Sequence, residues 1–175
     1  FSLGADTALN SIIDVVDKVK ESAVANQRVF VVEVMGRYCG FLTMLSGLAT
    51  GAEKVYLHEN GITLQDLQDD VNMFKKAFLD GKRMGLVLKS ENANHIYTTP
   101  FISALYEEDG GDIFDVRQTI LGHVQQGGNP SCFDRSMATK MASKSIEFLV
   151  ASVEGGRNDV VSIGLHGGHL DYRNL

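Results

Sequence analysis

One short run of the sequence joins a strand-like segment to residues that are suited to binding a phosphate. Residues 31–34 are valine apart from Glu33, and they lead into MGRYCG at 35–40. Valine is favoured in strands, an apolar run without alternation is typical of strands covered on both faces, and ligands of open α/β sheets lie beyond the carboxyl ends of strands. An arginine there can bind a phosphate through two charge-assisted hydrogen bonds. Arg37 is therefore either a phosphate ligand or a surface arginine that makes a helix-cap contact.

Two other predicted strands also end in polar residues. The strand at 84–89 is followed by Glu91, and the strand at 116–121 is followed by His123 and Gln126. Because parallel strands point the same way, these side chains and the arginine described above are expected to line one pocket. Cations bind phosphate and a carboxylate accepts hydrogen bonds from sugar hydroxyls, so the pocket suits a polyhydroxylated anion.

Each of these residues also has a purely structural interpretation. Glu91 is equally suited to be a solvated charge at a strand end, and a lone histidine such as His123 is more often a hydrogen-bonded core residue. Cys39 has no nearby base in the sequence, so it is expected to be a buried structural thiol. His166 and His169 flank two glycines without further ligands beside them, so no metal site is predicted there.

Two arginines are separated from this pocket. Arg28 and Arg117 lie at the beginnings of predicted strands, and therefore belong to the opposite edge of the sheet. They cannot reach the pocket within one lobe. They are expected either to serve a neighbouring subunit or half, or to be solvated strand-end charges.

The order of predicted elements indicates an α/β fold. Helix and strand alternate, which predicts a parallel-rich sheet with helices on both faces. Periodicity and capping residues predict helices from 6 or 7 to about Val24, with a turn at Asn26, and at 41–50, 63–79, 100–106 and from Ser131 or Asp134 through Leu149. Strands are predicted at 29–35, 55–57, 84–89 and 116–121, a polar loop at 107–112, and a terminal hairpin of 160–165 and 169–172.

Composition narrows the class of protein. A chain of 175 residues with 44% hydrophobic residues fits one domain, or one lobe of a larger protein. Its net charge of -6 argues against binding to nucleic acid or to an anionic membrane surface, and no apolar run reaches the roughly 18 residues that span a bilayer. Two cysteines without a pairing pattern indicate reduced thiols and a cytoplasmic location. Because the chain begins with Phe1, it is expected to be a piece of a longer polypeptide.

Several motifs, in order along the chain, resemble the ATP-dependent 6-phosphofructokinase family. They are GADTALN at 4–10, Arg28, EVMGRYCG at 33–40, LGHVQQGG at 121–128 and FDR at 133–135. The resemblance covers nearly the whole chain. It implies a phosphofructokinase-like lobe, in which residues 1–122 bind the sugar phosphate and residues 123–175 return to the nucleotide-binding lobe.

The resemblance also implies a role for each matching residue. Met35 and Gly36 correspond to residues that contact the sugar. Arg37 corresponds to an arginine that stabilises charge on the transferring phosphoryl group. Glu91 corresponds to a carboxylate that binds sugar hydroxyls, and His123 to a histidine that binds the sugar phosphate. Phosphoryl transfer depends mainly on positioning and charge neutralisation, which arginine side chains can supply.

Three further positions concern the partners and the type of site. Arg28 and Arg117 match arginines that the family supplies across a subunit interface. Gln126 stands where catalytic members carry arginine, and is similar to the C-terminal half of the duplicated eukaryotic enzymes, where the former active site has become an allosteric site for fructose 2,6-bisphosphate. Arg37 is nevertheless present where animal C-terminal halves have glycine, so a catalytic half remains the alternative. Cys39 with the following glycine resembles the ATP-dependent rather than the pyrophosphate-dependent group.

The resemblance implies a glycolytic enzyme that transfers the ATP γ-phosphoryl group to fructose 6-phosphate. ATP and Mg²⁺ are its cofactors, and their binding loops, with the catalytic aspartate, are expected before this chain begins. The chain alone is then expected to be inactive. The expected partners are fructose 6-phosphate or fructose 2,6-bisphosphate, the N-terminal half and other subunits of an oligomer. A non-catalytic sugar-phosphate sensor subunit is a further alternative.

Overall fold

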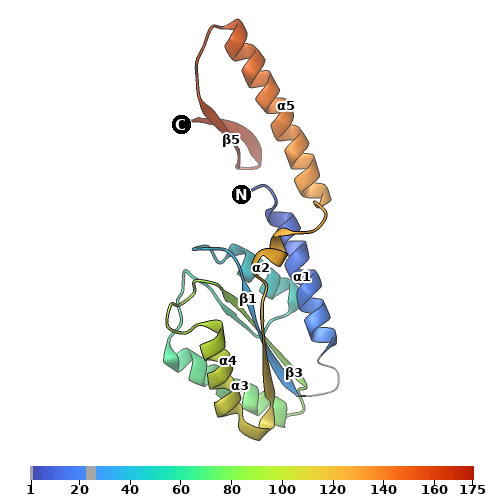
Figure 1. Ribbon diagram of the computed structural model, residues 1–175, viewed down its shortest axis with the longest axis vertical. Coiled ribbons are helices and arrows are strands. Elements are labelled where there is room, and N and C mark those ends of the chain that lie inside the picture. Colours follow the sequence, from blue (N-terminus) through green and yellow to red (C-terminus); the bar gives the residue numbers. More distant parts are fainter. Residues whose placement is uncertain (1, 23–26) are drawn as a thin grey trace. The chain divides into compact units, whose positions relative to one another are not determined.

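The computed structural model describes residues 2–22 and 27–175, which form two compact units (Figure 1). Residues 8–128 form the sheet unit, which contains four parallel strands and most of the helices. Residues 2–7 and 129–175 form the hairpin unit, which contains a long helix and two antiparallel strands. All eight residues of the predicted site belong to the sheet unit.

The sheet has the strand order β2-β3-β1-β4, and every neighbouring pair is parallel. In the register, Val34 is opposite Ser90 and Glu33 is opposite Ile120, so β1, β3 and β4 end at the same edge. This confirms the predicted parallel sheet. The strands are β1 (Arg28–Val34), β2 (Lys54–Tyr56), β3 (Met84–Ser90) and β4 (Asp115–Ile120).

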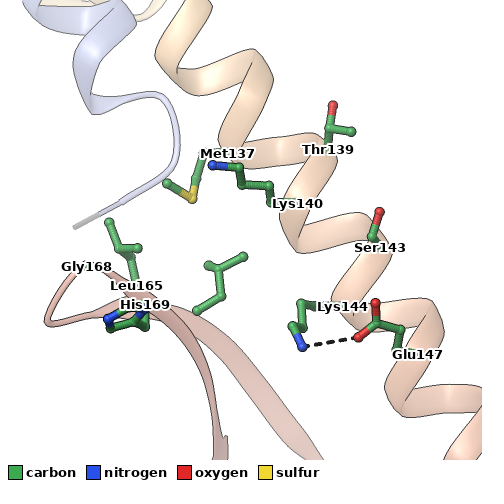
Figure 2. Close-up of a pocket in the computed structure, with 10 residues that line it drawn as sticks. Met137, Thr139, Lys140, Ser143, Lys144, Glu147, Leu165, Gly168 and His169 are labelled. Carbon is green, nitrogen blue, oxygen red and sulfur yellow. Dashed lines mark ion pairs between the residues drawn. The ribbon is translucent and has the colours of Figure 1, made fainter.

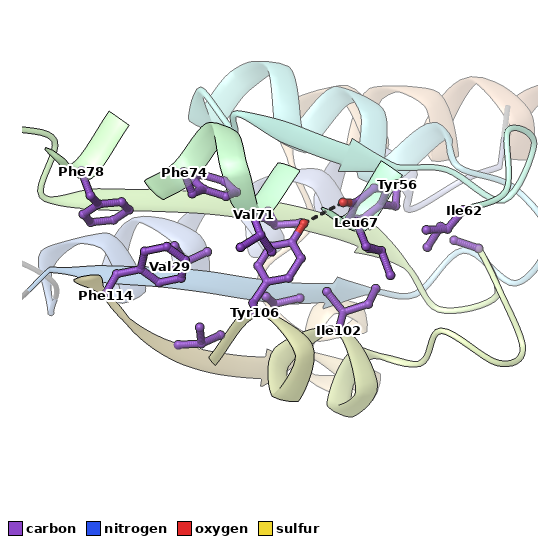
Figure 3. Packing of buried hydrophobic residues seen from close by; sticks show 14 residues of the cluster. Val29, Tyr56, Ile62, Leu67, Val71, Phe74, Phe78, Ile102, Tyr106 and Phe114 are labelled. Carbon is purple, nitrogen blue, oxygen red and sulfur yellow. Dashed lines mark hydrogen bonds between the residues drawn. The ribbon is translucent and has the colours of Figure 1, made fainter. Parts of the chain in front are cut away.

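One face of the sheet is covered by α3 (Leu64–Leu79) and α4 (Thr99–Gly110). Val29 and Val31 of β1 point to this side, where they join a buried cluster that includes the aromatic rings of Phe74, Phe78 and Tyr106 (Figure 3). Residues one apart on a strand point to opposite faces. The residues between these valines therefore point to the other side.

The opposite face is covered by α1 (Ala5–Glu21) and α2 (Phe41–Thr50). Phe30, Val32 and Val34 pack there with Ile12 and Val16 of α1. The predicted burial of the central strand on both faces is confirmed, and so are helices on both faces of the sheet. The predicted end of the first helix at Val24 and the turn at Asn26 lie outside the described residues.

The predicted polar loop at 107–112 is wrong. α4 continues to Gly110 and is followed by a short 3-10 helix, η1 (Gly111–Ile113). The acidic residues there lie on the exposed side of the helix, and charged residues on such a face do not interrupt a helix. Gly111, with a φ of 55°, ends α4, because this left-handed conformation suits glycine.

The hairpin unit contains α5 (Cys132–Glu154), β5 (Val161–His166) and β6 (His169–Asn174). The predicted terminal hairpin is confirmed, whereas α5 extends one turn beyond its predicted end. Tyr172 connects β6 to α5, since its hydroxyl donates to the carbonyl oxygen of Lys144 at 2.7 Å and its ring lies 5.2 Å from that of Phe148. Ser131 is the N-cap of α5.

One carboxylate satisfies the beginning of α1. Asp134 accepts hydrogen bonds from the backbone N–H groups of Gly4 at 2.9 Å and Thr7 at 2.8 Å, and from the Thr7 hydroxyl. The first N–H groups of a helix have no partner within the helix. Burial raises the pKa of Asp134, but the hydrogen bonds from Thr7 and Gly4 outweigh that effect and bring its pKa below the usual value.

This lowered pKa gives a pH-dependent contribution to stability. A carboxyl whose pKa is lower in the folded protein stabilises it above the unfolded pKa of about 3.9, and the contribution is lost as the pH falls through the folded pKa. We expect Asp134→Ala to lower the free energy of unfolding by about 1–3 kcal/mol at pH 7. Urea denaturation at pH 7 and at pH 2 measures both values. The exposed Asp14→Ala is the control, and an equal loss at both pH values would contradict the assignment.

Candidate functional site

The loop that follows β1 lies at the edge where three parallel strands end. Within residues 2–22 and 27–175, Arg37 is the one non-glycine residue with a positive φ, at 55°. The left-handed conformation costs an L-residue roughly 1–2 kcal/mol and persists only where surrounding contacts hold it. Cys39 in this loop is exposed, so its predicted burial is wrong.

The segment that follows β3 holds one side of this loop. The Glu91 carboxylate accepts hydrogen bonds from the backbone N–H groups of Gly36, at 3.1 Å, and Arg37. The Asn92 side-chain amide donates to the carbonyl oxygen of Arg37 at 3.1 Å. Both the N–H and the C=O group of Arg37 are thus paired with side chains of this segment. These contacts account for the persistence of its left-handed backbone.

The turn that follows β4 holds the other side. This turn is a 3-10 helix, η2 (Gly122–Gln126). The side-chain oxygen of Gln125 accepts from the N–H group of Met35 at 2.9 Å, and its nitrogen donates to the carbonyl oxygen of Met35 at 3.0 Å. Gln125 is buried, whereas His123 and Gln126 on the same turn are exposed.

The far end of the loop is held by Glu59. Its two carboxylate oxygens share the single N–H donor of Gly40 at the beginning of α2, at 2.8 and 3.1 Å. The hydrogen bond from Gly40 lowers the pKa of Glu59, and a negative charge is favourable at a helix N-terminus. A Cβ atom at Gly40 would lie 2.5 Å from Glu59 Oε2 and 3.0 Å from the Cβ atom of Leu57, so a larger residue here would displace the Glu59 carboxylate.

A buried lysine supports the end of β3. Lys89 is 1% exposed, and its ammonium group donates to Glu33 Oε2 at 3.2 Å and to the carbonyl oxygens of Ser90 at 3.1 Å and Glu91 at 3.2 Å. The Thr99 hydroxyl donates to the same oxygen of Glu33. This network holds the backbone from which the Glu91 side chain projects.

The structure therefore brings four of the predicted site residues into direct contact. Met35, Gly36 and Arg37 form the loop, and Glu91 binds its backbone. The guanidinium carbon of Arg37 lies 5.9 Å from the ring centroid of Tyr38, which is itself exposed. An exposed cation on a loop of fixed backbone can bind an anion at this edge.

The other two arginines lie at the amino edge of the sheet, as predicted from their places in the strands. Arg28 Nε is 3.9 Å and Arg117 Nη2 is 3.6 Å from the same carboxylate oxygen of Asp115. Arg117 also donates to the carbonyl oxygen of Val116 at 2.7 Å. Asp115 thus brings two guanidinium groups to one place.

Sequence reasoning missed the residues that support the loop, namely Glu59, Lys89, Asn92 and Gln125. A signal for Glu59 was present, because it follows β2 at the same strand edge as the predicted residues. No comparable signal exists for Gln125. It lies in the tight turn of η2, and the strand pattern that precedes this turn does not predict which of its side chains are buried.

A separate pocket lies within the hairpin unit (Figure 2). It has a volume of about 480 Å³ and is lined by α5 on one side and by the hairpin on the other. Lys140 and His169 contribute charge and polarity, and Lys144 forms an ion pair with Glu147 at 3.2 Å. None of the eight predicted site residues lines it.

Neither a metal-binding cluster nor a membrane-spanning helix is found among the described residues. In residues 2–22 and 27–175, no group of three or more histidine, cysteine, aspartate or glutamate side chains is arranged to hold a metal ion. Over the same ranges, each helix is too short or too polar to cross a membrane.

Comparison with known proteins identifies relatives of this chain. The family model described as Phosphofructokinase matches residues 1–149. The ATP-dependent 6-phosphofructokinase of Dictyostelium discoideum is 50% identical over 148 residues, which are 85% of this chain and 18% of that protein. The platelet-type enzyme of Rattus norvegicus is 46% identical over 156 residues, 89% of this chain and 20% of that protein.

The chain is also similar to a solved phosphofructokinase structure. The structure of phosphofructokinase from Saccharomyces cerevisiae matches with a TM-score of 0.92 and 34% identity, over 99% of this chain and 24% of that chain. The chain spans 18% and 20% of the length of the two curated relatives described above. Because the family model covers residues 1–149, the chain belongs to the phosphofructokinase family.

Proposed function

We propose that this chain forms part of a cytoplasmic ATP-dependent 6-phosphofructokinase, and that the carboxyl edge of its sheet binds a sugar phosphate. The enzyme transfers the γ-phosphoryl group of ATP to fructose 6-phosphate, giving fructose 1,6-bisphosphate in glycolysis. The relatives that support this proposal carry that name. Residues 1–122 are proposed to form the sugar-phosphate-binding lobe, and residues 123–175 to return to the nucleotide-binding lobe.

The observation that carries this proposal is the loop of Arg37. The exposed guanidinium group is presented from a left-handed backbone that Glu91 and Asn92 hold from one side. His123 and Gln126 lie on the adjoining turn, which Gln125 ties to the same loop. Phosphate recognition by arginine depends on the direction of its N–H groups. A fixed backbone restricts the range of orientations that the guanidinium group can adopt.

Within this function, the site is proposed to bind the effector fructose 2,6-bisphosphate. Gln126 stands where the resemblance places an arginine in catalytic members, so this site has one cation fewer than theirs. Arg37 and His123 remain to bind an anion at this edge. Arg28 and Arg117 supply further cations across a subunit interface, so the bound bisphosphate links two subunits of an oligomer.

A second candidate is the catalytic half of the same enzyme. Arg37 favours it, because strained backbone conformations of non-glycine residues are concentrated at sites of function. In that case Arg37 neutralises charge on the phosphoryl group in flight. The two candidates share the ligand edge and differ in whether Arg37 acts on turnover or on activation.

ATP and Mg²⁺ are proposed to bind in the rest of the enzyme. Among the described residues, no group of three or more histidine, cysteine, aspartate or glutamate side chains is placed to hold a metal ion. The chain by itself is then expected to have no kinase activity. Its partners are the sugar phosphate, the N-terminal half and other subunits.

Removal of Arg117 tests the proposed interfacial site. We expect Arg117→Ala to weaken binding of fructose 2,6-bisphosphate to the assembled oligomer by roughly tenfold to a hundredfold, because a hydrogen bond to a charged group is lost. Isothermal titration calorimetry measures the change. Arg83→Ala, which removes an exposed arginine at the same edge of the sheet, is the matched control. Unchanged affinity of the Arg117 variant would contradict an interfacial site.

A further inference from the structure

We propose that Gln125 is a positioning residue for the sugar-phosphate site, an inference that rests on the proposed function. Its side-chain amide fixes the distance between the loop that carries Arg37 and the turn that carries His123 and Gln126. Gln125 itself does not contact the ligand, since it is 3% exposed and both ends of its amide are bonded to Met35.

The amide of Gln125 extends the ladder between β1 and β4. The two strands pair in parallel as far as Glu33 and Ile120, and the last backbone hydrogen bond runs from the Leu121 N–H group to the Glu33 carbonyl oxygen at 3.1 Å. β4 then leaves the sheet and enters η2. The side chain of Gln125 turns back and pairs with the N–H and C=O groups of Met35, two residues beyond the last rung.

The chemistry of this bridge requires a primary amide. The Met35 N–H group needs an acceptor and its C=O group needs a donor, and Gln125 supplies one of each at 2.9 and 3.0 Å. A carboxylate of the same shape has acceptors only. A buried carbonyl group that lacks a hydrogen-bond donor, or that faces a negatively charged oxygen, destabilises the protein by most of the free energy of its desolvation.

The bridge and the contacts from the segment after β3 hold the loop from opposite sides. Glu91 holds Gly36 and Arg37 from one side, and Gln125 holds Met35 from the other. With the bridge broken, the loop stays attached to β3 but loses its register with η2. His123 then no longer has a fixed place relative to Arg37, and a ligand that needs both groups binds less tightly.

The test is Gln125→Glu in the assembled enzyme, with two measurements. Hydrogen exchange followed by mass spectrometry, on a peptide that covers 33–40, reports the bridge without any ligand. Calorimetry with fructose 2,6-bisphosphate and with fructose 6-phosphate reports the site. At pH 8 we expect faster exchange in this peptide and an affinity reduced roughly tenfold to a hundredfold.

Acid is expected to reverse both effects. A protonated carboxyl both donates and accepts, so it restores the bridge, and burial raises the pKa of a carboxyl toward neutrality. Each value is compared with that of the unaltered enzyme at the same pH, because His123, Glu91 and the ligand phosphate belong to the same proposed site. Gln68→Glu, the same change at an exposed helical position, is the control and should leave both values unchanged.

The possible outcomes separate the inference from the proposed function. Unaltered exchange and affinity at pH 8 would overturn the positioning role. If the unaltered enzyme binds neither sugar phosphate, the proposed function fails and the ligand role of Gln125 fails with it, while exchange still decides whether the bridge exists. If the glutamate variant does not assemble, Gln125→Asn replaces it: its amide is one methylene too short, so the same two losses are expected without recovery in acid, and their absence overturns the proposal.

Discussion

Replacing Lys89 by methionine is expected to lower the free energy of unfolding of the sheet unit by about 3 kcal/mol. Removing one member of a buried ion pair typically costs 3–5 kcal/mol, because the other charge is left without its partner. The low end applies here, since the Glu33 side chain is 19% exposed and the Thr99 hydroxyl still donates to its carboxylate. The carbonyl oxygens of Ser90 and Glu91 lose a donor as well.

Urea denaturation of a set of variants separates charge from packing. The double variant Lys89→Met with Glu33→Gln removes both charges and is expected to recover much of the stability that the single variant loses. Lys82→Met is the matched control, because Lys82 pairs with Glu53 in a more exposed place and should cost less. Equal losses for Lys82→Met and Lys89→Met would show that the buried network adds nothing.

Arg37→Ala is expected to abolish activation of the assembled enzyme by fructose 2,6-bisphosphate and to leave maximal turnover near normal. The exposed guanidinium group binds the effector in the proposed function, so its loss removes affinity without disturbing the core. Steady-state kinetics with and without the bisphosphate measure both quantities. A fall in turnover of about a hundredfold or more, as when a transition-state charge stabiliser is lost, would instead assign the chain to the catalytic half.

Two further substitutions at this position isolate the contributions of charge geometry and backbone. Arg37→Lys keeps the charge but loses paired N–H donors, so we expect activation to be weakened and not abolished. Arg37→Gly removes the same cation as Arg37→Ala while relieving the strain at a φ of 55°. The alanine and glycine variants should therefore lose activation alike and differ in stability. If all three retain both activation and turnover, the pocket has been assigned wrongly.

The alternation of helices and strands along the chain and the approximate ends of the long strands were predictable because they depend on local patterns. The apolar run before Arg37 and the alternation of helices with strands place Arg37, Glu91 and His123 at one edge without knowledge of the fold. The same rule applied to β2 would have included Glu59. β2 has only three residues, so its end gives a weaker signal than the ends of the longer strands.

The supporting contacts were not predictable in the same way. Gln125 and Glu91 bind backbone atoms 90 and 55 residues away in the sequence. Because nearly every residue has a backbone N–H group, the sequence does not indicate which of these groups a distant side chain will bind. Adjacent glutamines in η2 differ completely, with Gln125 buried and Gln126 exposed, because the tight turn directs successive side chains to different sides. The exposure of Cys39 follows from the path of the loop, which is set by these same distant partners.

The hydrogen bonds that hold residues 35–37 to β3 and η2 are made by the main chain of these residues. Glu91, Asn92 and Gln125 bind peptide groups of residues 35–37, and every amino acid except proline supplies these groups. The residues that determine the path of the loop are therefore different from the residues whose side chains the loop presents to a ligand. A gene duplication can exchange the displayed residue and acquire a new response to ligand, while the loop that displays it keeps its form.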